Sequence, residues 1–151
     1  MSAQSIPEAD ARAIMAAPKR GEPMSEWRPD RSHANTIVNA FGVVDEDGAT
    51  IPGLQVEMVV FRAPRGVMEG YAYTLFHLDA LGGRKRVYQL HINHKKGDRL
   101  GDHEYSHEHI GDLRIEADGN WASLSPMAAE VRFCLNCSLS LDPPLPVFDA
   151  Y

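Results

Sequence analysis

The sequence predicts an α+β fold, an antiparallel β-meander of about five strands with a C-terminal helix packed on one face and a short N-terminal helix and arm. Two observations support this prediction. Four runs with alternating apolar and polar residues follow one another between residues 36 and 94, joined by short turn-rich links. A helical pattern that begins with Ser125-Pro126 follows them.

The length and composition suit one globular domain. The chain has 151 residues, of which 44% are hydrophobic and 24% charged, so it can bury a substantial core. We expect an N-terminal helix and irregular arm in residues 1–33, a single α+β domain in 34–142 and a C-terminal tail in 143–151.

The charge and the N-terminus limit the cellular context. No apolar run approaches the ~20 residues that cross a membrane, and the first residues lack a basic leader followed by an apolar stretch. Two cysteines suit a reducing compartment. We therefore expect a cytoplasmic protein without a membrane partner. The net charge of -6 argues against a protein that coats nucleic acid non-specifically.

The individual elements follow from local patterns. Residues 8–17 favour a helix with Pro7 at its start, and the Pro- and Gly-rich segment after them predicts an irregular arm. The Asp47-Gly48 pair is typical of a hairpin turn. We expect four meander strands, in residues 36–44, 54–63, 71–79 and 86–94.

A fifth strand and a helix complete the prediction. We expect the fifth strand at about residues 107–116, paired with the fourth, with Gly111 marking a bulge or a break. In the helix, Ser125 predicts the N-cap and Pro126 the first helical position. Helical spacing predicts one face against the sheet, made of Met127, Val131, Cys134, Leu135 and Ser138.

Histidines are concentrated in one segment. Five of the seven histidines lie between residues 91 and 109. On the fourth strand His91 has the parity of the polar face, and His103, His107 and His109 share one parity if their segment is extended. Cations gather around the first two of these histidines: Arg84, Lys85, Arg86, Lys95, Lys96 and Arg99.

This segment predicts acid–base chemistry on RNA. Histidine exchanges protons near neutral pH, and a metal-independent ribonuclease needs only a base, an acid and cations for the phosphate. We expect His91, His107 and His109 to be catalytic, with Lys95, Lys96 and Arg99 binding the substrate.

A metal site is the alternative for the same segment. His107-x-His109 on a strand could share zinc or another divalent transition metal, with His103 as a third ligand. The carboxylate that a cupin-type motif places a few residues later is missing. We therefore expect no cofactor and no stoichiometric metal.

The Cys134-x-x-Cys137 pair favours a core role over redox chemistry. Redox pairs of this kind lie at helix N-termini, where the helix dipole lowers the thiol pKa. Here the pair falls late in the predicted helix. A Cys2His2 zinc site with the histidine segment is a minor alternative.

Three segments resemble a known family in their order: "PRGVMEGYAYTLFHLD", "GGRKRVYQLHINHKKG" and "DHEYSHEHIGD", followed by a helix. This layout is similar to that of TumE-type proteins of toxin–antitoxin loci over roughly residues 55–140. The resemblance implies a toxin that acts on RNA and is neutralised by a DNA-binding antitoxin. In that family the fourth strand tends to end in Tyr/Phe-Asp-Asn, whereas this chain has His91-Ile92-Asn93.

A non-catalytic protein is the rival class. An acidic single domain with a proline-rich arm is also typical of an inhibitor or accessory protein of a mobile element that binds a larger enzyme. Its negative charge would then steer it to a basic partner. The sequence does not indicate an oligomeric state.

Overall fold

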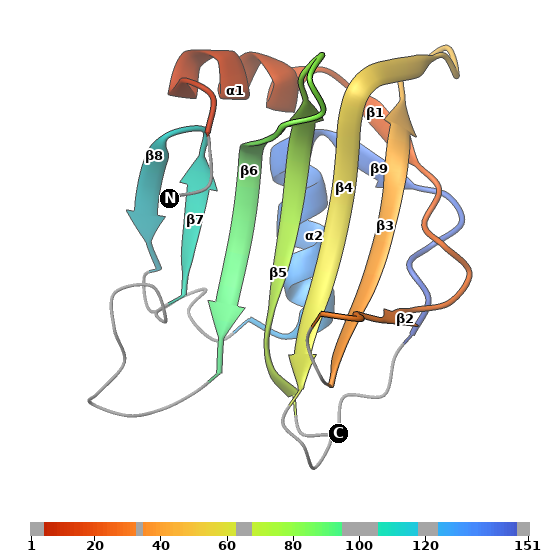
Figure 1. Cartoon of the computed structure of the whole chain (residues 1–151), viewed down its shortest axis with the longest axis vertical. Helices are drawn as coiled ribbons and strands as arrows, with labels where there is room; N and C mark the ends of the chain where they lie inside the picture. Colours follow the sequence, from red (N-terminus) through yellow and green to blue (C-terminus); the bar gives the residue numbers. More distant parts are fainter. Residues whose placement is uncertain (1–4, 33–34, 63–67, 95–105, 118–123, 148–151) are drawn as a thin grey trace.

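In the described part of the chain, one sheet and two helices make up the fold (Figure 1). The computed structural model describes residues 5–32, 35–62, 68–94, 106–117 and 124–147. Within these ranges nine strands form the sheet in the order β8-β7-β6-β5-β4-β3-β1-β9, and β2 pairs with β3. The helices are α1 (Glu8–Ala16) and α2 (Pro126–Cys137), and the strands are β1 (Lys19–Gly21), β2 (Arg28–Pro29), β3 (Thr36–Val44), β4 (Thr50–Arg62), β5 (Met68–Leu78), β6 (Arg84–Asn93), β7 (His107–Ile110), β8 (Leu113–Glu116) and β9 (Leu139–Leu141).

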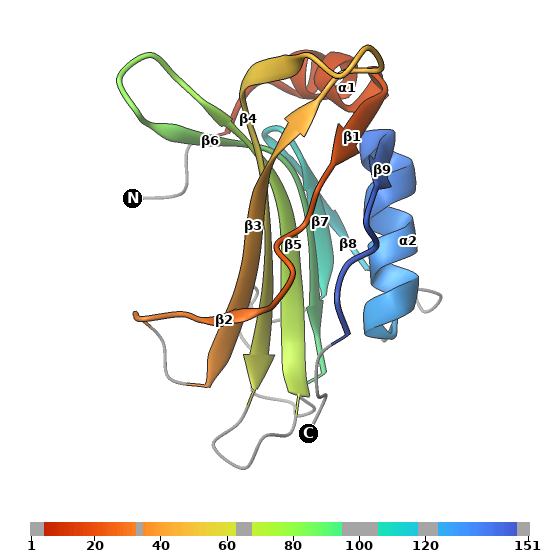
Figure 2. The ribbon, with the colours of Figure 1, turned by 90° about the vertical axis from the view of Figure 1, so that its right-hand side faces the viewer.

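The predicted α+β class and the antiparallel meander are confirmed. Strands β3 to β7 pair antiparallel in chain order. Helix α2 lies across one face of the sheet, and α1 lies at one end (Figure 2). Neither helix of the described residues lies on the opposite face of β4 to β7, which we call the helix-free face (Figure 1).

The core lies between the sheet and α2. Alternate side chains of β4, β5 and β6 point to this face and are fully buried, as the alternation predicts. Phe133 of α2 packs edge-on against Tyr73 and contacts Tyr88, with ring centroids 6.1 and 5.8 Å apart. Aromatic packing therefore holds α2 on the meander.

Both ends of α2 have specific caps. The Ser125 hydroxyl accepts a hydrogen bond from the Ala128 amide at 3.2 Å, and Pro126 begins the helix, as predicted. At the other end the Lys19 ammonium donates to the carbonyl of Cys137 at 2.7 Å. The same ammonium donates to the carbonyls of Met15 and Ala17, at 3.2 and 2.5 Å. One buried cation therefore satisfies the C-termini of both helices.

The sheet extends beyond the predicted meander of about five strands, and part of the expected arm pairs with it. Within the expected arm, residues 19–21 form β1, which pairs antiparallel with β3 and parallel with β9. Residues 28–29 form β2. Strands of two or three residues are too short to show alternation, so only the pairing partners identify them.

The fifth predicted strand is a hairpin. Chain reversal at Gly111-Asp112 divides residues 107–116 into β7 and β8. Gly111 has φ 56°, and glycine is favoured at the first position of such a two-residue turn. A Cβ on Gly111 would also collide with the Ile6 carbonyl, because the N-terminal segment crosses the turn. Asp112 accepts from the Glu8 amide at 3.0 Å and so stabilises the start of α1.

The predicted inner face of α2 is also wrong. Ala129, Phe133 and Cys137 face the sheet and are fully buried. The predicted apolar residues Met127, Val131 and Leu135 lie on the outer side and are 75%, 54% and 75% exposed. The pattern itself is helical, but α2 is apolar on both sides, so spacing alone could not select the inner face.

Candidate functional site

Three histidines meet on the helix-free face of the sheet, as the strand parity predicts. In the β6–β7 register His91 lies directly opposite His107, and His109 lies opposite Gln89. The ring centroids of His91 and His107 are 5.0 Å apart, and those of His107 and His109 are 4.8 Å apart. We call these three residues the histidine row.

The neighbouring strands complete the surroundings of the histidine row. In the β7–β8 register Glu116 lies opposite His107 and Arg114 lies opposite His109. Arg114 donates to the Glu116 carboxylate at 2.6 Å. On the other side, the Phe61 ring centroid is 6.1 Å from that of His91. Strand pairing therefore brings together residues from β4, β6, β7 and β8.

A second cation reaches this face through a bulge. The β5–β6 register shifts between Leu75 and Phe76, so Arg86 comes opposite Phe76 instead of following the parity of Tyr88. Arg86 donates to the Ser5 hydroxyl at 3.1 Å, and its buried Nε has no hydrogen-bond partner among the described residues. Burial, together with the nearby Arg114 guanidinium, lowers the pKa of Arg86.

The electrostatics of the site favour neutral imidazoles. Burial, with smaller contributions from His107 and Arg114, lowers the pKa of His91 to about 4. Burial, followed by the Arg86 charge, lowers the pKa of His109 to about 3. Both rings are therefore neutral near pH 7, and each can accept a proton or a hydrogen bond.

The members of the histidine row differ in accessibility. His91 and His109 are half-buried, whereas His107 is only 3% exposed. The central ring therefore contacts its two neighbours more than it contacts solvent. A molecule that lies on the sheet would meet His91 and His109 first.

Other residues that the sequence singles out lie elsewhere. His94 is hydrogen-bonded to Tyr71, with 3.3 Å between Nε2 and the hydroxyl, and is not part of the row. Cys137 is buried beneath α2 and Cys134 is half-buried on its flank. Lys95, Lys96, Arg99 and His103 lie outside the described residues.

Arg114 and Glu116 were missed as site residues by the sequence reasoning. A continuous strand over residues 107–116 leaves them without a partner in the histidine row, whereas the hairpin places them directly beside it. The available signal was Gly111-Asp112, a residue pair that suits a two-residue hairpin turn.

The described residues include no group of three or more His, Cys, Asp or Glu side chains placed to hold a metal ion. In the histidine row the adjacent ring planes are inclined by 57° and 89°.

Neither described helix is long and apolar enough to span a membrane.

Comparisons with known proteins add no relative. No protein-family model matches the chain, and neither a curated protein nor a solved structure matches it.

Proposed function

We propose that the protein is a toxin-like, metal-independent ribonuclease whose histidine row performs acid–base catalysis. The observation that carries this proposal is the contact of three imidazoles on a helix-free sheet face, with Arg86 and Arg114 beside them. Imidazole is the side chain best suited to proton transfer near neutral pH, and guanidinium is suited to phosphate.

The reaction needs two proton transfers. A neutral imidazole takes the proton of the ribose 2′-hydroxyl while the 2′-oxygen bonds to phosphorus. A protonated imidazole gives a proton to the 5′-oxygen while the bond from phosphorus to that oxygen breaks. The products are a 2′,3′-cyclic phosphate and a 5′-hydroxyl, and His91 and His109 are the two rings best placed to contact the RNA.

The substrate itself would supply the charge that the free site lacks. In the free protein both imidazoles are neutral because burial and the neighbouring cations disfavour their protonation. A phosphate anion placed between the imidazoles and the guanidinium groups reverses the sign of the local potential and raises the imidazole pKa values. One ring can then hold the proton that the leaving oxygen requires.

His107 has a positioning role in this proposal. Because it is buried and contacts both other rings, it would orient them rather than touch the RNA. Its replacement by Asn, which keeps a polar side chain, should lower kcat more than it raises KM. A change confined to KM would instead assign it to substrate binding.

Cleavage of a defined RNA oligonucleotide in a chelating buffer tests the proposal. The wild type should cleave it, and the His91→Ala/His109→Ala variant should be at least ~10²-fold slower. His77→Ala is the matched control, because His77 lies on β5 opposite Leu54, away from the row. A substrate with a 2′-deoxyribose at the scissile position should remain intact. Equal cleavage by the double variant, or no cleavage by the wild type, would refute the ribonuclease.

The cellular role is tested separately. The layout shared with TumE-type proteins supports a toxin whose partner is an antitoxin. Expression in a bacterial host should slow growth and degrade RNA, and the double variant should do neither. Cleavage in vitro without any effect on growth would keep the enzyme and exclude the toxin.

A further inference from the structure

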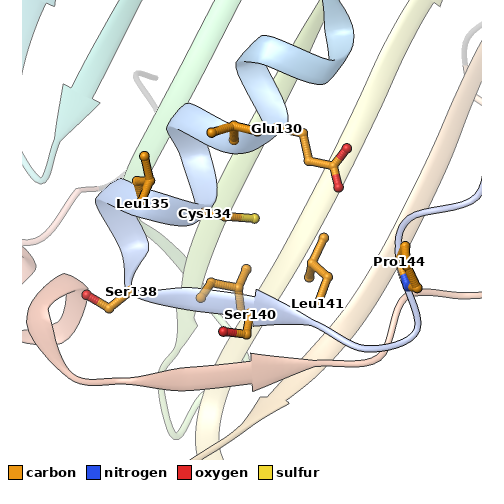
Figure 3. A pocket seen from close by; sticks show the side chains of 9 residues that line it. Glu130, Cys134, Leu135, Ser138, Ser140, Leu141 and Pro144 are labelled. Carbon is orange, nitrogen blue, oxygen red and sulfur yellow. The ribbon is translucent and has the colours of Figure 1, made fainter.

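A groove runs along the flank of α2, far from the histidine row. Two cavities of about 640 and 280 Å³ open between α2 and residues 139–147. Glu130 lines both cavities, so they are adjacent, and together we call them the α2 groove. Figure 3 shows Glu130 and Cys134 from α2 and Leu141 from β9 directed into the larger cavity.

The outer side of α2 beside this groove is apolar. Met127, Val131 and Leu135 follow one another at intervals of four residues, which aligns them as one ridge along the helix. All three are more than half exposed. The inner side of the same helix is apolar too, and a helix that is apolar on opposite sides is typical of one buried on both. This ridge and the groove form one surface suited to a partner.

Two polar groups in the groove indicate what kind of partner fits. Glu130 is the only charged residue lining either cavity in the described part of the chain. Its carboxyl pKa is raised by burial, so a cation nearby would stabilise the ionised form. Tyr73 lines the smaller cavity, and its buried hydroxyl has no hydrogen-bond partner among the described residues. A buried polar group of this kind is stabilised when a ligand supplies the missing hydrogen bond.

We propose that the α2 groove binds a peptide segment of a partner protein in which apolar side chains flank one basic residue. The apolar side chains lie against the ridge and in the two cavities, and the basic residue faces Glu130. A polar group of the segment meets the Tyr73 hydroxyl. The net charge of -6 would also speed the approach of a basic segment.

The test is selection of peptides from a displayed random dodecapeptide library on the intact chain, followed by titration of the enriched peptides. We expect these peptides to contain Lys or Arg between apolar residues. Their Kd should rise at least about tenfold with Leu135→Asp and severalfold with Glu130→Gln. Both positions are at the groove, and circular dichroism would verify that each variant folds. Leu81→Asp is the matched control for the first change, because Leu81 is 97% exposed in the turn between β5 and β6.

Several outcomes would overturn the proposal. One is the selection of equally good peptides by the Leu135→Asp variant, and another is enriched peptides without a basic residue that ignore Glu130→Gln. A third is a wild-type dimer in sedimentation that Leu135→Asp dissociates, because a second copy would then occupy the groove. Binding by the His91→Ala/His109→Ala variant should match the wild type, so this test does not depend on the ribonuclease.

Discussion

The histidine row should make the folded state sensitive to mild acid. His91 and His109 have pKa values of about 4 and about 3 in the folded protein, against 6.5 for an exposed histidine. Well above pH 6.5 both imidazoles are neutral in the folded and in the unfolded state, so they do not change the free energy of unfolding. As the pH falls below 6.5, the imidazoles become protonated in the unfolded chain while they stay neutral in the folded protein. The free energy of unfolding therefore decreases until the pH reaches the pKa values of the folded state.

The expected magnitude follows from these values. At about pH 5 the gap to 6.5 is roughly 1.5 pH units, and each unit is worth about 1.4 kcal/mol, so one fully buried imidazole costs about 2 kcal/mol. His91 and His109 are both half-buried and solvent screens part of their effect, so the share of each is reduced to about 1 kcal/mol. Together the pair should lower the free energy of unfolding by about 2 kcal/mol, a sizeable part of a typical domain's stability.

Urea denaturation near pH 7.5 and pH 5 measures this effect. The reference is a His91→Asn/His109→Gln variant, which keeps polar side chains but cannot take up protons. Because both proteins share all other titratable groups, the difference between their pH dependences isolates the two imidazoles. If the free energy of unfolding falls by the same amount in the wild type and the variant between the two pH values, the conclusion that His91 and His109 are buried and neutral is wrong. Inorganic phosphate at pH 5 should recover part of the wild-type loss if the row binds anions.

Three further predictions concern stability, measured by urea denaturation at neutral pH. Lys19→Met should cost about 2–4 kcal/mol, because it removes the charged hydrogen bonds at the ends of both helices and leaves buried carbonyls unpaired; a loss under 0.5 kcal/mol would contradict this capping role. Phe133→Ala should cost about 3–5 kcal/mol by opening a cavity between α2 and the sheet, whereas Val131→Ala on the outer side of α2 should cost under about 1 kcal/mol. Gly111→Ala should lower the free energy of unfolding by about 1–3 kcal/mol, because alanine is strained at a positive φ and its Cβ would push the N-terminal segment off the hairpin turn. Gly82 also has a positive φ but has open space around it, so Gly82→Ala should lower the free energy of unfolding by less.

The elements whose patterns are long enough could be predicted from the sequence alone. The alternation in β3 to β6 is repeated over many residues, and a strand has only two faces, so parity also placed His91, His107 and His109 on one side. The start of α2 was equally local, because Ser125 and Pro126 act on the first helical turn itself. For these elements the chemical preference of neighbouring residues is sufficient to predict the secondary structure.

Tertiary contacts decided the remaining features. Strands β1 and β9 are three residues each and form only because β1 pairs with β3 on one side and with the distant β9 on the other. The bulge that brings Arg86 to the histidine row comes from a register shift against β5, which β6 alone does not encode. Helix α2 carries apolar residues on opposite sides, and Phe133 faces inward because its ring fits between Tyr73 and Tyr88. Local sequence determines which backbone conformation a segment prefers, but the shape of the neighbouring surface determines which of two similar faces it buries.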